Sequence, residues 1–105
     1  MVKGDNKMPI KHYSKTGAFC RVTFHLPGGV EAKKVSLCGD FNEWNPENIP
    51  MKKRKDGRWS ITVSLKAGDD YRYKYLLDGE NWENDWNAEK YLPNSYGTED
   101  SVIKV

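Results

Sequence analysis

The sequence predicts an all-β fold in which antiparallel strands form a β-sandwich. Short segments that alternate apolar and polar side chains recur along the chain, and turn-forming residues separate them about every ten positions. No window places apolar residues three and four positions apart, as an amphipathic helix requires. The 105 residues are enough for one domain with one modest core.

The chain begins with a polar segment that leads into a strand. Residues 1–16 show little apolar periodicity and predict a flexible N-terminal tail or linker, so the folded domain is expected to span residues 17–105. The first strand alternates between two faces and ends at the Pro-Gly-Gly turn of residues 27–29. Its inward face carries Cys20, Val22, Phe24 and Leu26.

Three more strands are expected in the middle of the chain. The first covers residues 33–38, and a short edge strand then leads from Met51 into the Asp56-Gly57 turn, which is a hairpin signal. Trp59 opens the third strand and belongs to its apolar face. This tryptophan is therefore assigned to the core.

The last part of the sequence predicts two strands separated by a long connection. The strand over residues 71–77 turns its three tyrosines to one face and Arg72, Lys74 and Leu76 to the other. Residues 87–98 are expected to form a long loop. Residues 101–105 are strand-like because they are rich in β-branched side chains.

The charge and hydropathy of the chain argue against nucleic-acid and membrane partners. Its 17 basic and 15 acidic residues give a net charge of +2, and no apolar run is long enough to span a membrane. The basic run of residues 52–55 precedes a turn, so a solvated hairpin is favoured over a targeting or phosphate-binding patch. The start of the chain lacks the apolar segment of a signal peptide, and a soluble, cytoplasmic protein is expected.

The sequence offers no pattern for a metal, a cofactor or a disulfide framework. Cys20 and Cys38 are too few for a disulfide scaffold and are assigned to buried strand positions. His12 and His25 fit no zinc-binding spacing. Neither a phosphate-cradling glycine loop nor a catalytic serine motif occurs.

Catalysis is not expected either. A glycosidase needs two carboxylates at a fixed separation, in a groove that raises the pKa of one of them. A small two-sheet domain rarely encloses such a groove, and carboxylates in turns usually cap backbone amides. The carboxylates near the predicted loops are Asp40, Glu43, Asp85, Glu99 and Asp100.

Aromatic side chains on polar loops are the main functional signal. The segment Gly39-Asp40-Phe41-Asn42-Glu43-Trp44 is predicted to turn sharply, with backbone freedom at Gly39, Phe41 packed back and Trp44 carried outward. A tryptophan among polar neighbours offers a flat apolar platform to a ligand with hydroxyl edges, such as a sugar ring. The alternative is that Trp44 covers the edge of the core.

Five ordered motifs resemble those of carbohydrate-binding module family 48, and the resemblance covers residues 17–105. The motifs are residues 39–44, 56–59, 73–79, Trp82 with Asn84-Asp85, and residues 96–98 leading into 101–103. This family includes the glycogen-binding domain of AMP-activated protein kinase β subunits. It also includes the N-terminal domains of isoamylases and glycogen-branching enzymes.

The resemblance implies an early-set, immunoglobulin-like β-sandwich that binds α-1,4-linked glucans such as glycogen, starch and maltooligosaccharides without catalysing a reaction. It also implies two platform tryptophans, a lysine on the sheet and a loop that grips the next sugars. The matching positions in this chain are Trp44, Lys74, Trp82, Tyr96, Thr98 and Asp100.

Three positions depart from the family pattern. Asp100 stands where the family commonly has Asn, which removes an amide donor and adds a charge. Trp86 stands where the family often has a proline after the Asn84-Asp85 turn. The extra residue Asn81 lengthens the turn before Trp82. Trp86 is expected to pack on the following loop or to lie at the rim of the site.

The competing hypothesis is a protein-interaction domain. Such a domain would pack on a catalytic amylolytic domain or a kinase subunit and leave the sugar site unused. The joint presence of Trp44, Lys74 and Trp82 favours sugar binding.

Overall fold

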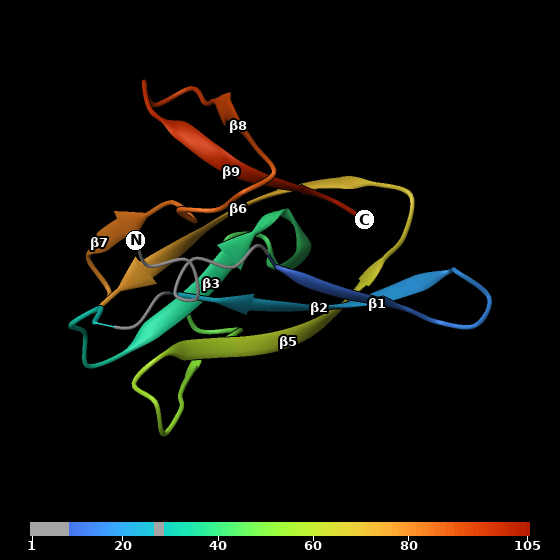
Figure 1. Cartoon of the computed structure of the whole chain (residues 1–105). Coiled ribbons are helices and arrows are strands. Elements are labelled where there is room, and N and C mark those ends of the chain that lie inside the picture. Colours follow the sequence, from blue (N-terminus) through green and yellow to red (C-terminus); the bar gives the residue numbers. More distant parts are fainter. Residues whose placement is uncertain (1–8, 27–28) are drawn as a thin grey trace.

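The computed structural model describes residues 9–26 and 29–105, which form two antiparallel β-sheets (Figure 1). Apart from one 3-10 turn, the described residues contain no helix, so the predicted all-β sandwich is confirmed. In chain order the elements are β1 (Ile10–Tyr13), β2 (Phe19–His25), β3 (Val35–Gly39), the 3-10 turn η1 (Asp40–Asn42), β4 (Lys52–Lys53), β5 (Trp59–Lys66), β6 (Asp70–Leu77), β7 (Asn81–Glu83), β8 (Lys90–Pro93) and β9 (Glu99–Lys104).

The strands divide into a sheet of four and a sheet of five. The smaller sheet has the order β1-β2-β5-β4, and the larger has the order β3-β6-β9-β8 with β7 added beside β6. Strand β6 organises the larger sheet, because β3 pairs along one side of it. On its other side β9 pairs with the first half and β7 with the second half.

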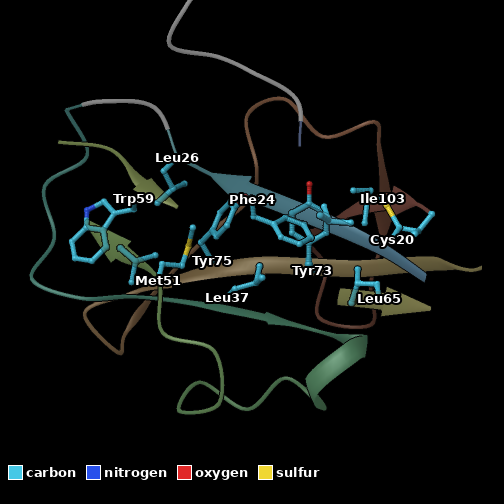
Figure 2. Close-up of a cluster of buried hydrophobic side chains, with 13 residues drawn as sticks. Cys20, Phe24, Leu26, Leu37, Met51, Trp59, Leu65, Tyr73, Tyr75 and Ile103 are labelled. Atoms are coloured by element: carbon cyan, nitrogen blue, oxygen red, sulfur yellow. The ribbon is translucent and has the colours of Figure 1, made fainter. Parts of the chain in front are cut away.

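The core lies between the sheets and is formed by the inward-facing half of each alternating strand (Figure 2). From the smaller sheet, β2 contributes Phe24, and from the larger sheet β6 contributes Tyr73 and Tyr75; all three are fully buried. Phe24 and Tyr73 meet edge to face with ring centroids 4.9 Å apart. Trp59 is only 6% exposed, which confirms its predicted core position.

The two cysteines occupy buried strand positions, as predicted. Cys20 lies in β2 and Cys38 in β3, so the two belong to different sheets, and both are free thiols. Cys20 belongs to the core cluster between the sheets. Burial raises the pKa of Cys38 to about 11.

The N-terminal segment differs from its prediction. Residues 1–16 are expected to be a tail, but Ile10–Tyr13 form β1, which pairs with β2 along its whole length. The Nζ of Lys11 donates to the carbonyl of Lys104 and pairs with Glu89, so β1 is also tied to the end of β9. Residues 1–8 of the predicted tail lie outside the described residues, as do Pro27 and Gly28 of the predicted turn.

The segment expected to be a long loop, residues 87–98, contains an additional strand. Its residues Lys90–Pro93 form β8 at the edge of the larger sheet, paired with β9. The strand was not predicted because it is short and ends in a proline, which only an edge position tolerates.

No helix within the described residues is long and apolar enough to cross a membrane.

Candidate functional site

An open cleft of about 950 Å³ brings together all six residues that the resemblance singles out, namely Trp44, Lys74, Trp82, Tyr96, Thr98 and Asp100. These residues come from the turn after β3, from β6 and β7, from the segment between β8 and β9, and from β9 itself, which contains Asp100. The cleft is also lined by five residues that were not predicted: Asp40, Arg72, Pro93, Asn94 and Ser95.

The register of the larger sheet explains why Lys74 and Trp82 reach the same cleft. Lys74 pairs with Cys38 of β3, and Leu76, two residues further along β6, pairs with Trp82 of β7. Residues two apart on a strand point the same way, and directly paired residues on neighbouring strands share a face. Lys74, Leu76 and Trp82 therefore all face away from the buried tyrosines of β6. This confirms the outward direction predicted for Lys74.

The turn that carries Trp44 is built around the side chain of Asn42. Its Oδ1 accepts a hydrogen bond from the backbone N–H of Gly39 at 2.9 Å, and its Nδ2 donates to the carbonyl of Leu37 at 3.0 Å. These bonds fold the chain back on the end of β3. Trp44 then donates its backbone N–H to the carbonyl of Gly39 at 3.0 Å, which closes the turn.

Two consecutive non-glycine residues in this turn adopt left-handed backbone angles. Glu43 has a φ of 55° and Trp44 a φ of 58°. For non-glycine residues such angles cost about 1–3 kcal/mol each and persist only where surrounding contacts hold them. Here the Asn42 bonds and the 3.2 Å bond from Trp44 Nε1 to Asp40 Oδ1 supply those contacts. The strained turn therefore sets the direction of the indole.

Gly39 is required for a different reason than the one predicted. Its φ of −174° is extended backbone that any residue adopts, so conformational freedom is not needed at this position. A Cβ atom there would lie 2.5 Å from the carbonyl oxygen of Arg72 and 2.8 Å from the ring of Phe41. Glycine is needed because β6 and the Phe41 ring approach too closely for any side chain. Phe41 packs against the core, as predicted.

Trp44 and Trp82 form a pair at one wall of the cleft. Their ring centroids are 6.3 Å apart, and the ring planes meet at 64°. Trp82 is 47% exposed, while Trp44 is half-buried. Trp44 is not among the described side chains that pack on the core, so the structure favours the platform interpretation over a cover for the core edge.

A loop held by Asn94 also lines the cleft. The Oδ1 of Asn94 accepts hydrogen bonds from the backbone N–H groups of Tyr96 and Thr98, at 2.9 and 3.1 Å. Its Nδ2 donates to Thr98 Oγ1 at 2.8 Å and to Asp100 Oδ1 at 2.9 Å. The loop is thus fixed by one amide side chain, and Tyr96, which is 89% exposed, stands at its tip.

The floor of the cleft holds two basic side chains against one buried carboxylate. Asp100 is 7% exposed; its Oδ2 accepts from Arg72 Nη1 at 3.2 Å, and its Oδ1 lies 4.0 Å from Lys74 Nζ. Lys74 also donates to Thr98 Oγ1 at 3.3 Å, and Arg72 to the carbonyl of Pro93 at 3.0 Å. The remaining N–H donors of these cations can serve hydroxyl groups of a ligand.

One of the unpredicted residues had a signal in the sequence. Arg72 lies two residues before Lys74 on the same face of β6, so the parity that selected Lys74 also selects Arg72. Asn94 had a weaker signal, because an Asn in a Pro-Asn-Ser segment is typical of any turn. Its bonds to Asp100 and Thr98 depend on how β8 pairs with β9, which the sequence does not reveal.

Trp86 lies outside this arrangement. It is 60% exposed and does not line the cleft, although it is only four residues from Trp82.

Over the described ranges, no group of three or more His, Cys, Asp or Glu side chains could hold a metal ion. The arrangement is therefore an open cleft lined by aromatic side chains, by charged groups of both signs and by hydrogen-bonding groups.

Comparison with known proteins places this chain in a family. The family model described as "Carbohydrate-binding module 48 (Isoamylase N-terminal domain)" matches residues 29–97, more than half of the chain. The chain belongs to this family. The membership accords with the immunoglobulin-like sandwich predicted from the sequence, and the matched region includes both tryptophans and the loop up to Gly97.

Similar sequences occur in proteins named 1,4-alpha-glucan branching enzyme GlgB. The chain is 42% identical to that of Aquifex aeolicus over 69 residues, which are 62% of this chain and 10% of the relative. It is 37% identical to that of a Bradyrhizobium species over 71 residues, 61% of this chain and 10% of the relative. The chain thus spans about a tenth of the length of these relatives.

A solved structure shares the fold at low sequence identity. Enterochelin esterase from Shigella flexneri superposes with a TM-score of 0.70 and 12% identity, over 91% of this chain and 32% of that chain. At this identity the likeness concerns the fold alone.

Proposed function

We propose that this chain is a non-catalytic module that binds α-1,4-linked glucans, such as glycogen, starch and maltooligosaccharides, in the cleft. The observation that carries the proposal is the angled pair of Trp44 and Trp82, whose ring planes meet at 64°. An α-1,4 linkage curves a glucan chain, whereas a β-1,4 linkage keeps it flat. Two angled platforms suit the C–H faces of consecutive sugars in a curved chain.

The other cleft residues have roles that follow from their donors and acceptors. Lys74 Nζ and Thr98 Oγ1, 3.3 Å apart, would bond the hydroxyl rim of a sugar that stacks on the tryptophans. Tyr96, at the exposed tip of the loop held by Asn94, would contact the next sugar along the chain. Asp40 keeps Trp44 in place through the bond from its indole N–H.

A second candidate function is packing against a catalytic domain. It is favoured by the small share of each branching enzyme that the match covers, because the rest of such a protein could contact this module. The relatives named above support an amylolytic catalytic domain as the partner and add nothing in favour of a kinase subunit.

A cytoplasmic location is part of the proposal, since two buried free thiols suit a reducing compartment.

Retention on insoluble α-glucan tests the proposal. The purified chain is incubated with insoluble starch or glycogen-loaded resin, with cellulose as the matched control. We expect retention on the α-glucan, release by soluble maltoheptaose and no retention on cellulose. Equal retention on cellulose would overturn selectivity for α-linked glucans, and retention on neither polymer would overturn glucan binding. In the second case, association with the purified catalytic part of a branching enzyme would support the packing function instead.

A further inference from the structure

We propose that Asp100 is an internal counter-ion of the cleft: it positions Arg72, Lys74 and Asn94, and it makes the cleft select uncharged glucans over phosphorylated ones. The choice of ligand rests on the proposed function. The role of Asp100 is distinct from that function, because the resemblance implies a direct sugar contact at this position.

The carboxylate of Asp100 is already occupied. Its Oδ1 accepts from Asn94 Nδ2 at 2.9 Å and lies 4.0 Å from Lys74 Nζ, while its Oδ2 accepts from Arg72 Nη1 at 3.2 Å. The side chain of Asp100 is only 10% exposed. A buried carboxylate with charged partners on both oxygens has little capacity left for a sugar hydroxyl.

The partners of Asp100 are the groups that face a ligand. Asn94 holds the loop that presents Tyr96, through bonds to two backbone N–H groups of that loop. Arg72 joins β6 to the end of β8, because it also donates to the carbonyl of Pro93. Asp100 thus acts on the ligand through its neighbours, as a positioning residue.

The charges that line the cleft cancel. They are the carboxylates of Asp40 and Asp100 and the cations of Arg72 and Lys74, two of each sign. Both oxygens of Asp40 are used as well, by the indole N–H of Trp44 and the backbone N–H of Arg72. An uncharged glucan has no charge to desolvate when it enters such a cleft. A phosphate monoester, with a charge of about −1.5 to −2, would give up its hydration without net attraction.

Asp100→Asn removes the negative charge with almost no change in shape and leaves one excess cation. Binding is measured calorimetrically for maltoheptaose and for maltoheptaose that carries one phosphate monoester, at low and high salt. We expect the affinity ratio of phosphorylated to uncharged ligand to rise by about tenfold relative to the wild type. This preference should fall at high salt, whereas wild-type binding of maltoheptaose should change little with salt.

Two further variants separate this effect from others. Glu99→Gln makes the same change in net charge at the adjacent, exposed residue outside the cleft, and it should leave the ratio unchanged. Arg72→Gln combined with Asp100→Asn removes the excess cation and should restore the wild-type ratio. An affinity ratio that stays at the wild-type value in Asp100→Asn would overturn the proposed selectivity, whatever the change in affinity for maltoheptaose. So would a shift of equal size in Glu99→Gln.

A measurement without ligand tests the positioning role even if the chain binds no glucan. The Arg72 guanidinium, held by Asp100 and the Pro93 carbonyl, should rotate slowly and give a resolved Nη1–H signal by NMR. In Asp100→Asn this signal should average with those of the other guanidinium N–H groups of Arg72. An averaged signal in the wild type would overturn the positioning role, whereas failure of the wild type to bind maltoheptaose would overturn the proposed function.

Discussion

Trp82 and Trp86 are four residues apart and are 47% and 60% exposed, yet only Trp82 lines the cleft. Trp82 belongs to β7, where its pairing with Leu76 of β6 directs it to the outer face of the sheet. Trp86 follows Asp85, which is 4% exposed and bonded to the tyrosine hydroxyls of the core. Strand register, rather than exposure, therefore separates the two tryptophans.

Replacing each tryptophan with alanine tests this difference. Trp82→Ala should weaken maltoheptaose binding by about 1–2 kcal/mol, roughly tenfold or more, because a stacking surface is lost. Its free energy of unfolding should change by no more than about 0.5 kcal/mol, since the ring faces solvent. Trp86→Ala, the matched control, should bind like the wild type. Calorimetry and thermal unfolding of both variants check this. Loss of binding in Trp86→Ala alone would mean that the second platform is wrongly assigned.

Gly39→Ala tests the requirement for space beneath the Trp44 turn. The added Cβ would lie 2.5 Å from a backbone oxygen of β6 and 2.8 Å from the Phe41 ring, so we expect a loss of stability of about 1–3 kcal/mol. Gly68→Ala is the contrast, because its Cβ meets nothing within 4 Å and only its φ of 95° is unfavourable. Urea unfolding measures both. If Gly39→Ala is as stable as the wild type, β3 and β6 are packed less closely than the 2.5 Å distance implies.

At the scale of elements, Asp85 connects the larger sheet with the segment between β7 and β8. Its Oδ2 accepts from the hydroxyl of Tyr73 at 2.7 Å and from that of Tyr75 at 3.4 Å, both in β6. Its backbone N–H donates to the Oγ of Ser101 in β9 at 2.9 Å. The apolar core thus closes at this end around one buried carboxylate.

The stability of the protein should depend on pH through Asp85. Burial raises the pKa of this carboxyl, although hydrogen bonds from Tyr73 and from the backbone of Asn87 partly oppose the shift. An unfolded aspartate titrates near pH 3.9, so the native state binds the proton more tightly than the unfolded chain does. The contribution of Asp85 to stability therefore falls as the pH rises from about 4 through the raised native pKa.

Urea unfolding of the wild type and of Asp85→Asn between pH 4 and pH 7 measures this contribution. The stability of the wild type relative to the variant should decrease as the pH rises. Glu89→Gln should show the opposite slope: burial alone would raise the pKa of Glu89, but the hydrogen bond and charge of Lys11 lower it overall. The contribution of Glu89 is thus lost as the pH falls. A difference between the wild type and Asp85→Asn that stays constant with pH would contradict the prediction.

The strands that the sequence predicted are those whose own side chains alternate. In β2 and β5 every second residue is apolar and buried or packed on the core, so the local pattern is sufficient. The strands β1 and β8 have no such pattern and are mostly exposed. They exist because β2 and β9 present unpaired backbone groups at sheet edges, and a local pattern does not report a distant partner.

At the scale of the whole molecule, the six cleft residues were predicted from motifs, whereas the support beneath them was not. Trp44 and Tyr96 could be named because large aromatic side chains stand among polar loop residues, and Lys74 because alternation places it on the face of β6 that turns away from the core. The roles of Asn94 and Asp100 depend on side-chain bonds between the β8–β9 loop, β9 and β6, which appear only when the sheet is assembled. The sequence therefore reveals the ligand-facing groups more readily than the groups that hold them.

The whole cleft should bind a single short glucan weakly. Each tryptophan offers about 150–250 Å² of surface, of which a sugar covers roughly a third, so at about 25 cal/mol/Å² each platform contributes on the order of 1–2 kcal/mol. Hydrogen bonds to Lys74 and Thr98 add about 1 kcal/mol each, and association has an ordering cost. Maltoheptaose should then bind with a Kd of roughly 10 µM to 1 mM in a calorimetric titration. A nanomolar Kd would require a more enclosed site than this open cleft. Absence of heat at millimolar sugar, with the chain still retained on insoluble α-glucan, would place the binding surface elsewhere on the molecule.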